Sequence, residues 1–194
     1  MESRPTPDDI SKLRDILWQS PIVRTILERA SELKMPNWYL AAGCISQTVW
    51  NHLHGFEPSY GINDYDLIYY DDKDITSESQ EEYLNDAKEL FKDLGVSIDV
   101  VNEARVHLWF GDFFGYDIKP YRSAEDAIAT WPYNSTCVGA RYENGKFEVY
   151  APHGLGDIFE LTIRLNKDTI FNESSYKDKA PRWMKVWPKL KLIK

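Results

Sequence analysis

The sequence predicts an α/β (α+β) fold, a mixed β-sheet flanked by helices, with an N-terminal helix pair and a C-terminal hairpin and tail. Short runs of β-branched and aromatic residues alternate with longer amphipathic segments, which is typical of strands mixed with helices. An Asn-Gly pair between two apolar runs predicts the hairpin. The 194 residues suffice for one domain over 1–194, comprising N-terminal helices (1–35), a core (36–165) and a basic tail (166–194).

The first elements are two helices. Apolar residues recur every three to four positions over residues 8–19 and 22–33, and the proline between these segments suits the first turn of a helix. The short apolar run 38–42 predicts a buried strand. Gly43 ends that strand, and a helical pattern resumes over 46–54.

The middle of the chain predicts two strands joined by a helix. Residues 65–70 (YDLIYY) and 97–101 (SIDVV) are rich in β-branched and aromatic side chains, as strands are. Between them, residues 78–94 show a strong helical pattern, and Gly95 provides the stop. A further helical stretch is predicted over 103–110.

The C-terminal third predicts short elements. Ser123 opens a helix, because Asp126 three residues later completes a pattern that resembles a capping box. Residues 138–142 and 146–150 form the two strands of the hairpin. A short helix is expected over 155–161, and the tail, which contains two prolines, is expected to be irregular or only briefly helical.

The charge of the chain is uneven. The net charge is −8, yet residues 177–194 carry seven Lys or Arg and one Asp, or +6, so that the remainder carries −14. Proteins that grip the nucleic-acid backbone usually show a basic footprint, so the acidic body argues against binding to long nucleic acids. The tail is either a solvated terminal segment or a local site for phosphates.

The two cysteines and the N-terminus indicate the cellular compartment that we expect. Cys44 and Cys137 lie in no CxxC motif and no Cys/His cluster, so the sequence indicates neither a zinc site nor a disulfide framework. The polar N-terminus lacks the apolar stretch of a signal peptide, and no apolar run reaches the ~18 residues of a membrane span. We therefore expect a cytoplasmic protein with reduced thiols and no membrane partner.

Three aspartates carry the chemistry that the sequence suggests. On a strand alternate residues share a face, so Asp64 and Asp66 project together. Asp99 lies in a second apolar strand, and a helix long enough to place the two strands side by side separates them. Three converging carboxylates would suit Mg²⁺ or Mn²⁺ and the transfer of phosphoryl or nucleotidyl groups.

A purely structural role remains an alternative for each of these aspartates. Asp64 and Asp66 could be solvated carboxylates at the end of a strand, and Asp99 could be a buried group bonded to loop amides. The turn at Gly43 would let a backbone approach a phosphate at a helix N-terminus. In that turn Ser46 could donate to a phosphate or cap the helix, as its type often does.

Six segments taken together resemble a bacterial family of nucleotidyltransferase-like proteins within the polymerase-β-type nucleotidyltransferase superfamily. This resemblance implies a nucleotidyltransferase-like sheet and a metal on Asp64, Asp66 and Asp99. It also implies a nucleoside triphosphate near Gly43 and Cys44. The matching segments are AAGCISQTVWNHLHG (41–55), INDYDLIYYD (62–71), DVVNEARVHLWF (99–110), YRSAEDAIATWP (121–132), APHGLGDIFEL (151–161) and WPKLKL (187–192).

Our leading hypothesis is a metal-dependent transferase that moves a nucleoside monophosphate to an acceptor hydroxyl and releases pyrophosphate. Arg105 is a candidate for a phosphate contact, and His107 is either a contact to the substrate or a packed helix residue. The superfamily usually has Gly or Ser where Cys44 stands, which favours a non-catalytic nucleotide-binding module as the alternative. The acceptor, whether small molecule, protein or RNA, is open. A third hypothesis is an interaction protein with structural acids.

Overall fold

The computed structural model describes residues 4–193, and its N-terminal part is the expected pair of helices. Helix α1 (Pro7–Leu17) is capped by Thr6, whose hydroxyl accepts a hydrogen bond from the amide of Asp9 at 3.1 Å. Helix α2 (Pro21–Arg29) begins with its proline at the first helical position, where no backbone N–H is needed. Both helices bury their apolar faces in the main hydrophobic core.

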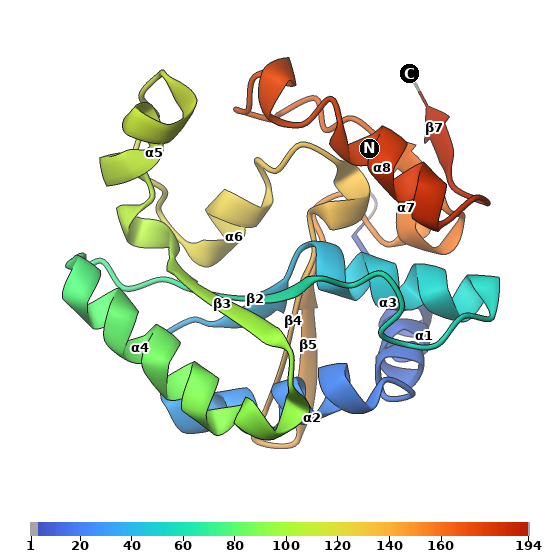
Figure 1. The fold of residues 1–194 in the computed structure, drawn as a ribbon, viewed down its shortest axis with the longest axis horizontal. Coiled ribbons are helices and arrows are strands. Elements are labelled where there is room, and N and C mark those ends of the chain that lie inside the picture. Colours follow the sequence, from blue (N-terminus) through green and yellow to red (C-terminus); the bar gives the residue numbers. More distant parts are fainter. Residues whose placement is uncertain (1–3, 194) are drawn as a thin grey trace.

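A five-stranded mixed sheet of order β3-β2-β1-β4-β5 lies at the centre of residues 4–193 (Figure 1). Strands β2 and β3 are parallel, whereas the pairs β1/β2, β1/β4 and β4/β5 are antiparallel. This mixed sheet with flanking helices confirms the predicted α/β fold class. The strands are β1 (Tyr39–Ala41), β2 (Asp64–Tyr69), β3 (Ser97–Asn102), β4 (Gly139–Glu143) and β5 (Lys146–Tyr150).

Helix α4 (Ser77–Leu90) provides the crossover that lets β2 and β3 lie parallel as neighbours. The hydroxyl of Thr76 caps its first turn. The prediction of one continuous helix over 78–94 was wrong at its end. Beyond Leu90 the chain tightens into the 3-10 helix Lys92–Leu94, because the left-handed residue Gly95 (φ 64°) closes the last turn.

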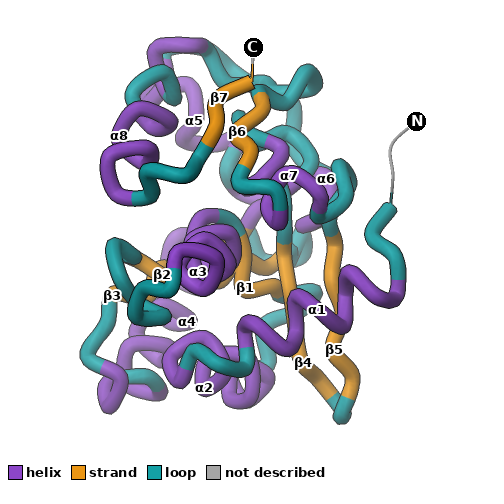
Figure 2. The backbone as a smooth tube through the Cα atoms, turned by 90° about the vertical axis from the view of Figure 1, so that its right-hand side faces the viewer, coloured by secondary structure: helices purple, strands orange, loops and turns teal. Residues whose placement is uncertain are grey.

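The sheet separates two groups of helices (Figures 1 and 2). Helices α2 and α4 cover one face, where alternate strand residues such as Leu67 and Val100 join the main core. Helix α6 (Ala124–Ile128) packs on the opposite face against Ile68. Helix α3 (Gly43–His54) packs against α1 and β2, so its N-terminus lies close to the strand that carries Asp64 and Asp66.

The hairpin follows the expected pattern. Strands β4 and β5 are joined by Asn144 and Gly145, whose φ angles of 52° and 77° are those of a two-residue type I′ turn. The predicted helix over 103–110 is divided, because Asn102 caps a separate 3-10 turn ahead of α5. No helix in the described range is both long and apolar enough to cross a bilayer. The remaining elements are the 3-10 helices Ala30–Leu33, Glu103–Arg105, Asn134–Thr136 and Glu173–Ser175, the helices α5 (His107–Phe114) and α7 (Gly156–Phe159), and the strand β6 (Thr162–Arg164).

The tail is more ordered than its prolines suggest. Helix α8 (Lys179–Val186) holds Pro181 in its first turn, where a missing N–H leaves no hydrogen bond unmade. Strand β7 (Lys191–Ile193) then pairs in parallel with β6, a pairing that the sequence did not predict. Trp187 anchors this segment, because its indole Nε1 donates to the buried Asn51 Oδ1 on α3 at 2.6 Å.

Candidate active site

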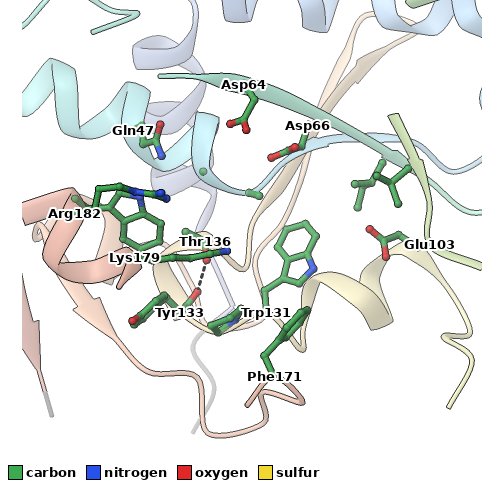
Figure 3. A pocket seen from close by; sticks show the side chains of 16 residues that line it. Gln47, Asp64, Asp66, Glu103, Trp131, Tyr133, Thr136, Phe171, Lys179 and Arg182 are labelled. Atoms are coloured by element: carbon green, nitrogen blue, oxygen red, sulfur yellow. Dashed lines mark hydrogen bonds between the residues drawn. The ribbon is translucent and has the colours of Figure 1, made fainter. Parts of the chain in front are cut away.

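A cavity of about 370 Å³ opens between the sheet, the start of α3 and helix α8 (Figure 3). This volume lies within the roughly 300–1,000 Å³ of typical ligand pockets. In Figure 3 the carboxylates of Asp64 and Asp66 point into the cavity from β2, and Lys179 and Arg182 of α8 lie across from them. Aromatic side chains, Trp131 among them, complete the lining.

Three carboxylates converge beside this cavity, and two of them, Asp64 and Asp66, line it. Asp66 on β2 pairs in register with Asp99 on the parallel strand β3, and Asp64 lies two residues earlier on the same face. One oxygen from each of the three can be chosen so that all lie within 4.8 Å of one another. The parallel pairing therefore brings together two segments that lie 33 positions apart in the sequence.

The three carboxylates repel one another, and the effect is seen in the raised pKa of Asp66. Asp66 is half-buried, whereas Asp64 and Asp99 are exposed. Burial and then the charges of Asp64 and Asp99 raise the pKa of Asp66 to about 7, and Lys179 partly offsets this effect. A cation among the three oxygens would relieve the repulsion, and three carboxylate oxygens are ligands that Mg²⁺ prefers. The donor set therefore fits a divalent metal.

The start of α3 forms a second wall of the cavity. Gly43 and Ala42 both line it, and the predicted contact of Gly43 with a nucleotide stays a prediction. Ala42 adopts φ 61° and ψ −135°, a region that residues with a Cβ rarely occupy, and such strain is common near binding sites. The free amides of the first turn of α3 favour an anion in front of them.

The side chains of Cys44 and Ser46, although they belong to the first turn of α3, do not line the cavity. The Cys44 thiol is 1% exposed and donates to the Ala41 carbonyl at 3.2 Å. The Ser46 hydroxyl is fully buried and donates to the carbonyl of Ser135. Neither side chain lines the cavity, and their role as nucleotide contacts stays a prediction.

Arg105 and His107 also lie outside the cavity lining. The Arg105 guanidinium Nε donates to the carbonyl of Ile75 at 3.3 Å. His107 begins α5, and its Nδ1 is buried without a hydrogen-bond partner in the described structure. Their proposed contacts to substrate therefore stay predictions.

Several lining residues were not named individually from the sequence, although the basic tail was considered as a local site for phosphates. Glu103, directly after β3, is 5% exposed and lines the cavity. Lys179 and Arg182 come from the tail, in which lysines near a tryptophan-rich segment were the available signal. Trp131 closes one side. The signal for Glu103 was an acidic residue immediately after an apolar strand that already carries one candidate ligand.

Comparisons with known proteins agree with this geometry. A solved structure, described as an NMR structure that reveals a CCA-adding enzyme head domain, matches with a TM-score of 0.76 and 24% identity, covering 99% of this chain and 98% of that chain. At this identity the match shows the fold. No curated protein matches the sequence. Residues 28–192 match the family described as Nucleotidyltransferase. The chain therefore belongs to the nucleotidyltransferase family, with a substrate that the match leaves open.

Proposed function

We propose that this protein is a metal-dependent nucleotidyltransferase that moves a nucleoside monophosphate from a triphosphate to an acceptor hydroxyl. The observation that carries this proposal is the cluster of Asp64, Asp66 and Asp99, whose oxygens lie within 4.8 Å of one another beside a cavity. Family membership and fold point to the same chemistry.

The three aspartates would hold Mg²⁺ or Mn²⁺. A bound divalent ion supplies charge that offsets the phosphate oxygens and lowers the pKa of an attacking hydroxyl. Asp64 and Asp66 line the cavity and would face the phosphates, whereas Asp99 approaches from β3 and would face the acceptor. The raised pKa of Asp66 supports this assignment, because perturbed carboxyls cluster at functional sites.

The cations of α8 and the start of α3 would hold the triphosphate. Lys179 and Arg182 line the cavity opposite the aspartates, and no carboxylate in residues 4–193 lies within 4.0 Å of either cation. Desolvation and then Arg182 lower the pKa of Lys179, while Asp66 and Asp64 act in the opposite direction. Phosphate oxygens would satisfy both cations, and the amides near Gly43 would bind the same anion.

The chemical step would be an in-line displacement at the α-phosphorus. The acceptor oxygen forms a bond to that phosphorus, the bond to the bridging oxygen of the β-phosphate breaks, and pyrophosphate leaves. The acceptor proton passes to the Asp99 carboxylate and from there to solvent, because Asp99 is exposed. The candidate acceptors belong to three classes: a small molecule, a protein side chain or an RNA end.

Label transfer tests the proposal. Each of the four triphosphates, labelled at the α-phosphate, is incubated with the protein, Mg²⁺ or Mn²⁺, and a cell extract as the acceptor pool. The extract is then divided by nuclease and protease treatment into RNA, protein and small molecules. We expect label in one fraction with wild type and with the exposed control Asp72→Ala, and none with Asp64→Ala. No transfer with any triphosphate, or equal transfer with Asp64→Ala, refutes the enzyme proposal.

A nucleotide-binding module without turnover is the second candidate. It is favoured by Cys44, which replaces the usual Gly or Ser of the turn, and by the Ser46 hydroxyl, which is bonded to Ser135. This candidate predicts that calorimetry detects triphosphate binding while label transfer stays at background. Transfer of label above the Asp64→Ala background refutes it.

A further inference from the structure

Glu103 is a buried carboxyl without a partner. Its side chain lines the cavity, the residue is 5% exposed, and no hydrogen bond or ion pair from any residue in 4–193 reaches its carboxyl oxygens. Glutamates this deeply buried are almost always paired in folded proteins. Figure 3 shows its carboxyl facing the cavity, on the side away from Lys179 and Arg182.

The backbone around Glu103 is held firmly in place. The Asn102 side chain accepts from the amide of Ala104 at 3.1 Å and donates to the carbonyls of Asp71 and Asp74 at 2.9 and 3.1 Å. The Asn102 amide in turn donates to Gln80 on α4 at 2.9 Å. Because these bonds fix the start of the 3-10 turn, Glu103 is held at the cavity wall.

The surroundings offer Glu103 no positive charge. Burial, and then the charge of Asp66, raise the pKa of Glu103 to about 8. Arg105, two residues further along the chain, bonds the carbonyl of Ile75 at 3.3 Å. The described residues therefore supply no hydrogen-bond donor to the Glu103 carboxyl.

Trp131 provides a flat surface beside this carboxyl. Its half-buried indole lines the same cavity, and among the described rings none stacks on it. Figure 3 shows the indole projecting into the cavity between Asp66 and Phe171. An aromatic surface next to a hydrogen-bonding side chain is the combination that recognises an unpaired nucleobase.

We propose that Glu103 and Trp131 form a nucleobase subsite that selects bases carrying an exocyclic amino group. The inference rests on the proposed function, because it takes the ligand to be a triphosphate whose phosphates lie at the Lys179 end. An amino N–H can be accepted by the Glu103 carboxyl in either protonation state, whereas a keto oxygen is bonded only by the protonated form. At a pH above the pKa of Glu103 the carboxyl is ionised and bonds only the amino group, so adenine and cytosine would bind more tightly than hypoxanthine and uracil.

Matched nucleotide pairs test this selection. Calorimetry with Ca²⁺, chosen to bind without turnover, compares ATP with ITP and CTP with UTP on the wild-type protein at a pH above the pKa of Glu103. Within each pair an amino group is replaced by a keto oxygen. We expect the amino nucleotide of at least one pair to bind about tenfold more tightly, which is typical of a good base contact. Equal affinity within both pairs overturns the inference, and it is also the result expected if the amino group that Glu103 binds belongs to the acceptor.

Variants locate the selection. Glu103→Leu is expected to bring the affinity ratio of the selected pair close to one, while Trp131→Leu weakens both members by roughly tenfold and keeps their ratio. Glu81→Gln, an exposed carboxyl on α4, is the matched control for Glu103→Gln, which is expected to lose the preference. A preference that persists in Glu103→Leu overturns the inference.

The outcome also separates this inference from the proposed function. If the wild-type protein binds no triphosphate with Ca²⁺ or Mg²⁺, the proposed function fails and the inference fails with it. If all four nucleotides bind with one affinity, the proposed function stands and only the inference is refuted. Because the wild-type comparison needs no variant, a failure of Glu103→Leu to fold leaves the test intact.

Discussion

The two faces of strand β2 have opposite roles in the protein. Tyr65, Leu67 and Tyr69 point into the main core and are at most 1% exposed. Asp64 and Asp66, which alternate with them, face the cavity, where their charges repel each other. Successive side chains of a strand project to opposite sides. One face of β2 therefore stabilises the fold by burial, whereas the other destabilises it by charge repulsion.

This difference teaches how the protein keeps a repulsive cluster in place. Strand β3 repeats the arrangement, with Ile98 and Val100 in the core and Asp99 on the other face. Burial on the core side fixes both strands rigidly, so the carboxylates cannot move apart to lower their repulsion. The core face supplies stability, which holds the three carboxylates together on the cavity face despite their repulsion.

Asp66→Asn is the strongest way to break this comparison. It removes a charge from the cavity face while it keeps the shape of the side chain. We expect label transfer to fall by about a thousandfold or more, because several kcal/mol of charge stabilisation is lost. We also expect the free energy of unfolding without metal to stay equal or rise, since the repulsion with Asp64 and Asp99 disappears.

Kinetics and urea unfolding of the same preparation measure these two effects. Asp72→Asn, which alters an exposed carboxylate outside the cavity, serves as the control. A stable protein with unchanged transfer would show that the cavity face of β2 is not catalytic. A marked loss of stability would show that Asp66 is a structural residue.

Leu67→Ala tests the other face. The side chain is fully buried in the main core, so its truncation leaves a cavity, and we expect the free energy of unfolding to fall by about 2–5 kcal/mol. Transfer per folded molecule, measured well below the melting temperature, should change little because the carboxylates keep their register. A selective loss of activity at unchanged stability would contradict the division between the two faces.

Binding of metal and triphosphate should offset the charge repulsion among the carboxylates on the cavity face. Metal with a triphosphate at 100 times its dissociation constant would stabilise the wild-type protein by about 2.7 kcal/mol, which raises its melting temperature. The rise should be absent in Asp66→Asn and present in Leu67→Ala, which is measured by thermal melts with and without ligand. Equal shifts in all three proteins would place the ligand elsewhere.

Ala42→Gly has the smallest expected effect on the free energy of unfolding. It tests whether backbone strain beside the cavity adds to the destabilisation on that face. At φ 61° and ψ −135° the Cβ of Ala42 is strained beside the cavity. Glycine relieves this strain but has more freedom in the unfolded chain, so we expect a net gain of about 1 kcal/mol. Urea unfolding gives the value, and a destabilised variant would show that this backbone conformation carries little strain.

Local patterns explain what the sequence predicted correctly. The alternation of side chains along a strand placed Asp64 and Asp66 on one face, and a helix between two apolar strands indicated that the strand of Asp99 could lie beside them. The Asn-Gly turn likewise determined the hairpin. These features depend on short stretches of chain, where side-chain alternation and turn geometry decide the outcome.

Long-range packing explains what was missed. Lys179 reaches the cavity because Trp187 packs on Trp50 and bonds Asn51, contacts between segments over 130 positions apart. The three-residue pairing of β6 with β7 is too short to leave a periodic pattern. The direction of the Ser46 hydroxyl, toward Ser135, depends on a distant loop. The division into 1–35, 36–165 and 166–194 stays a prediction.

The late position of α8 in the chain has a consequence for synthesis on the ribosome. All three aspartates are translated by residue 99, whereas Lys179 and Arg182 follow some 80 residues later. At ordinary rates of elongation this gap lasts on the order of ten seconds. The carboxylates of a nascent chain can therefore come together well before the opposing cations exist, and the cavity is completed only when α8 docks.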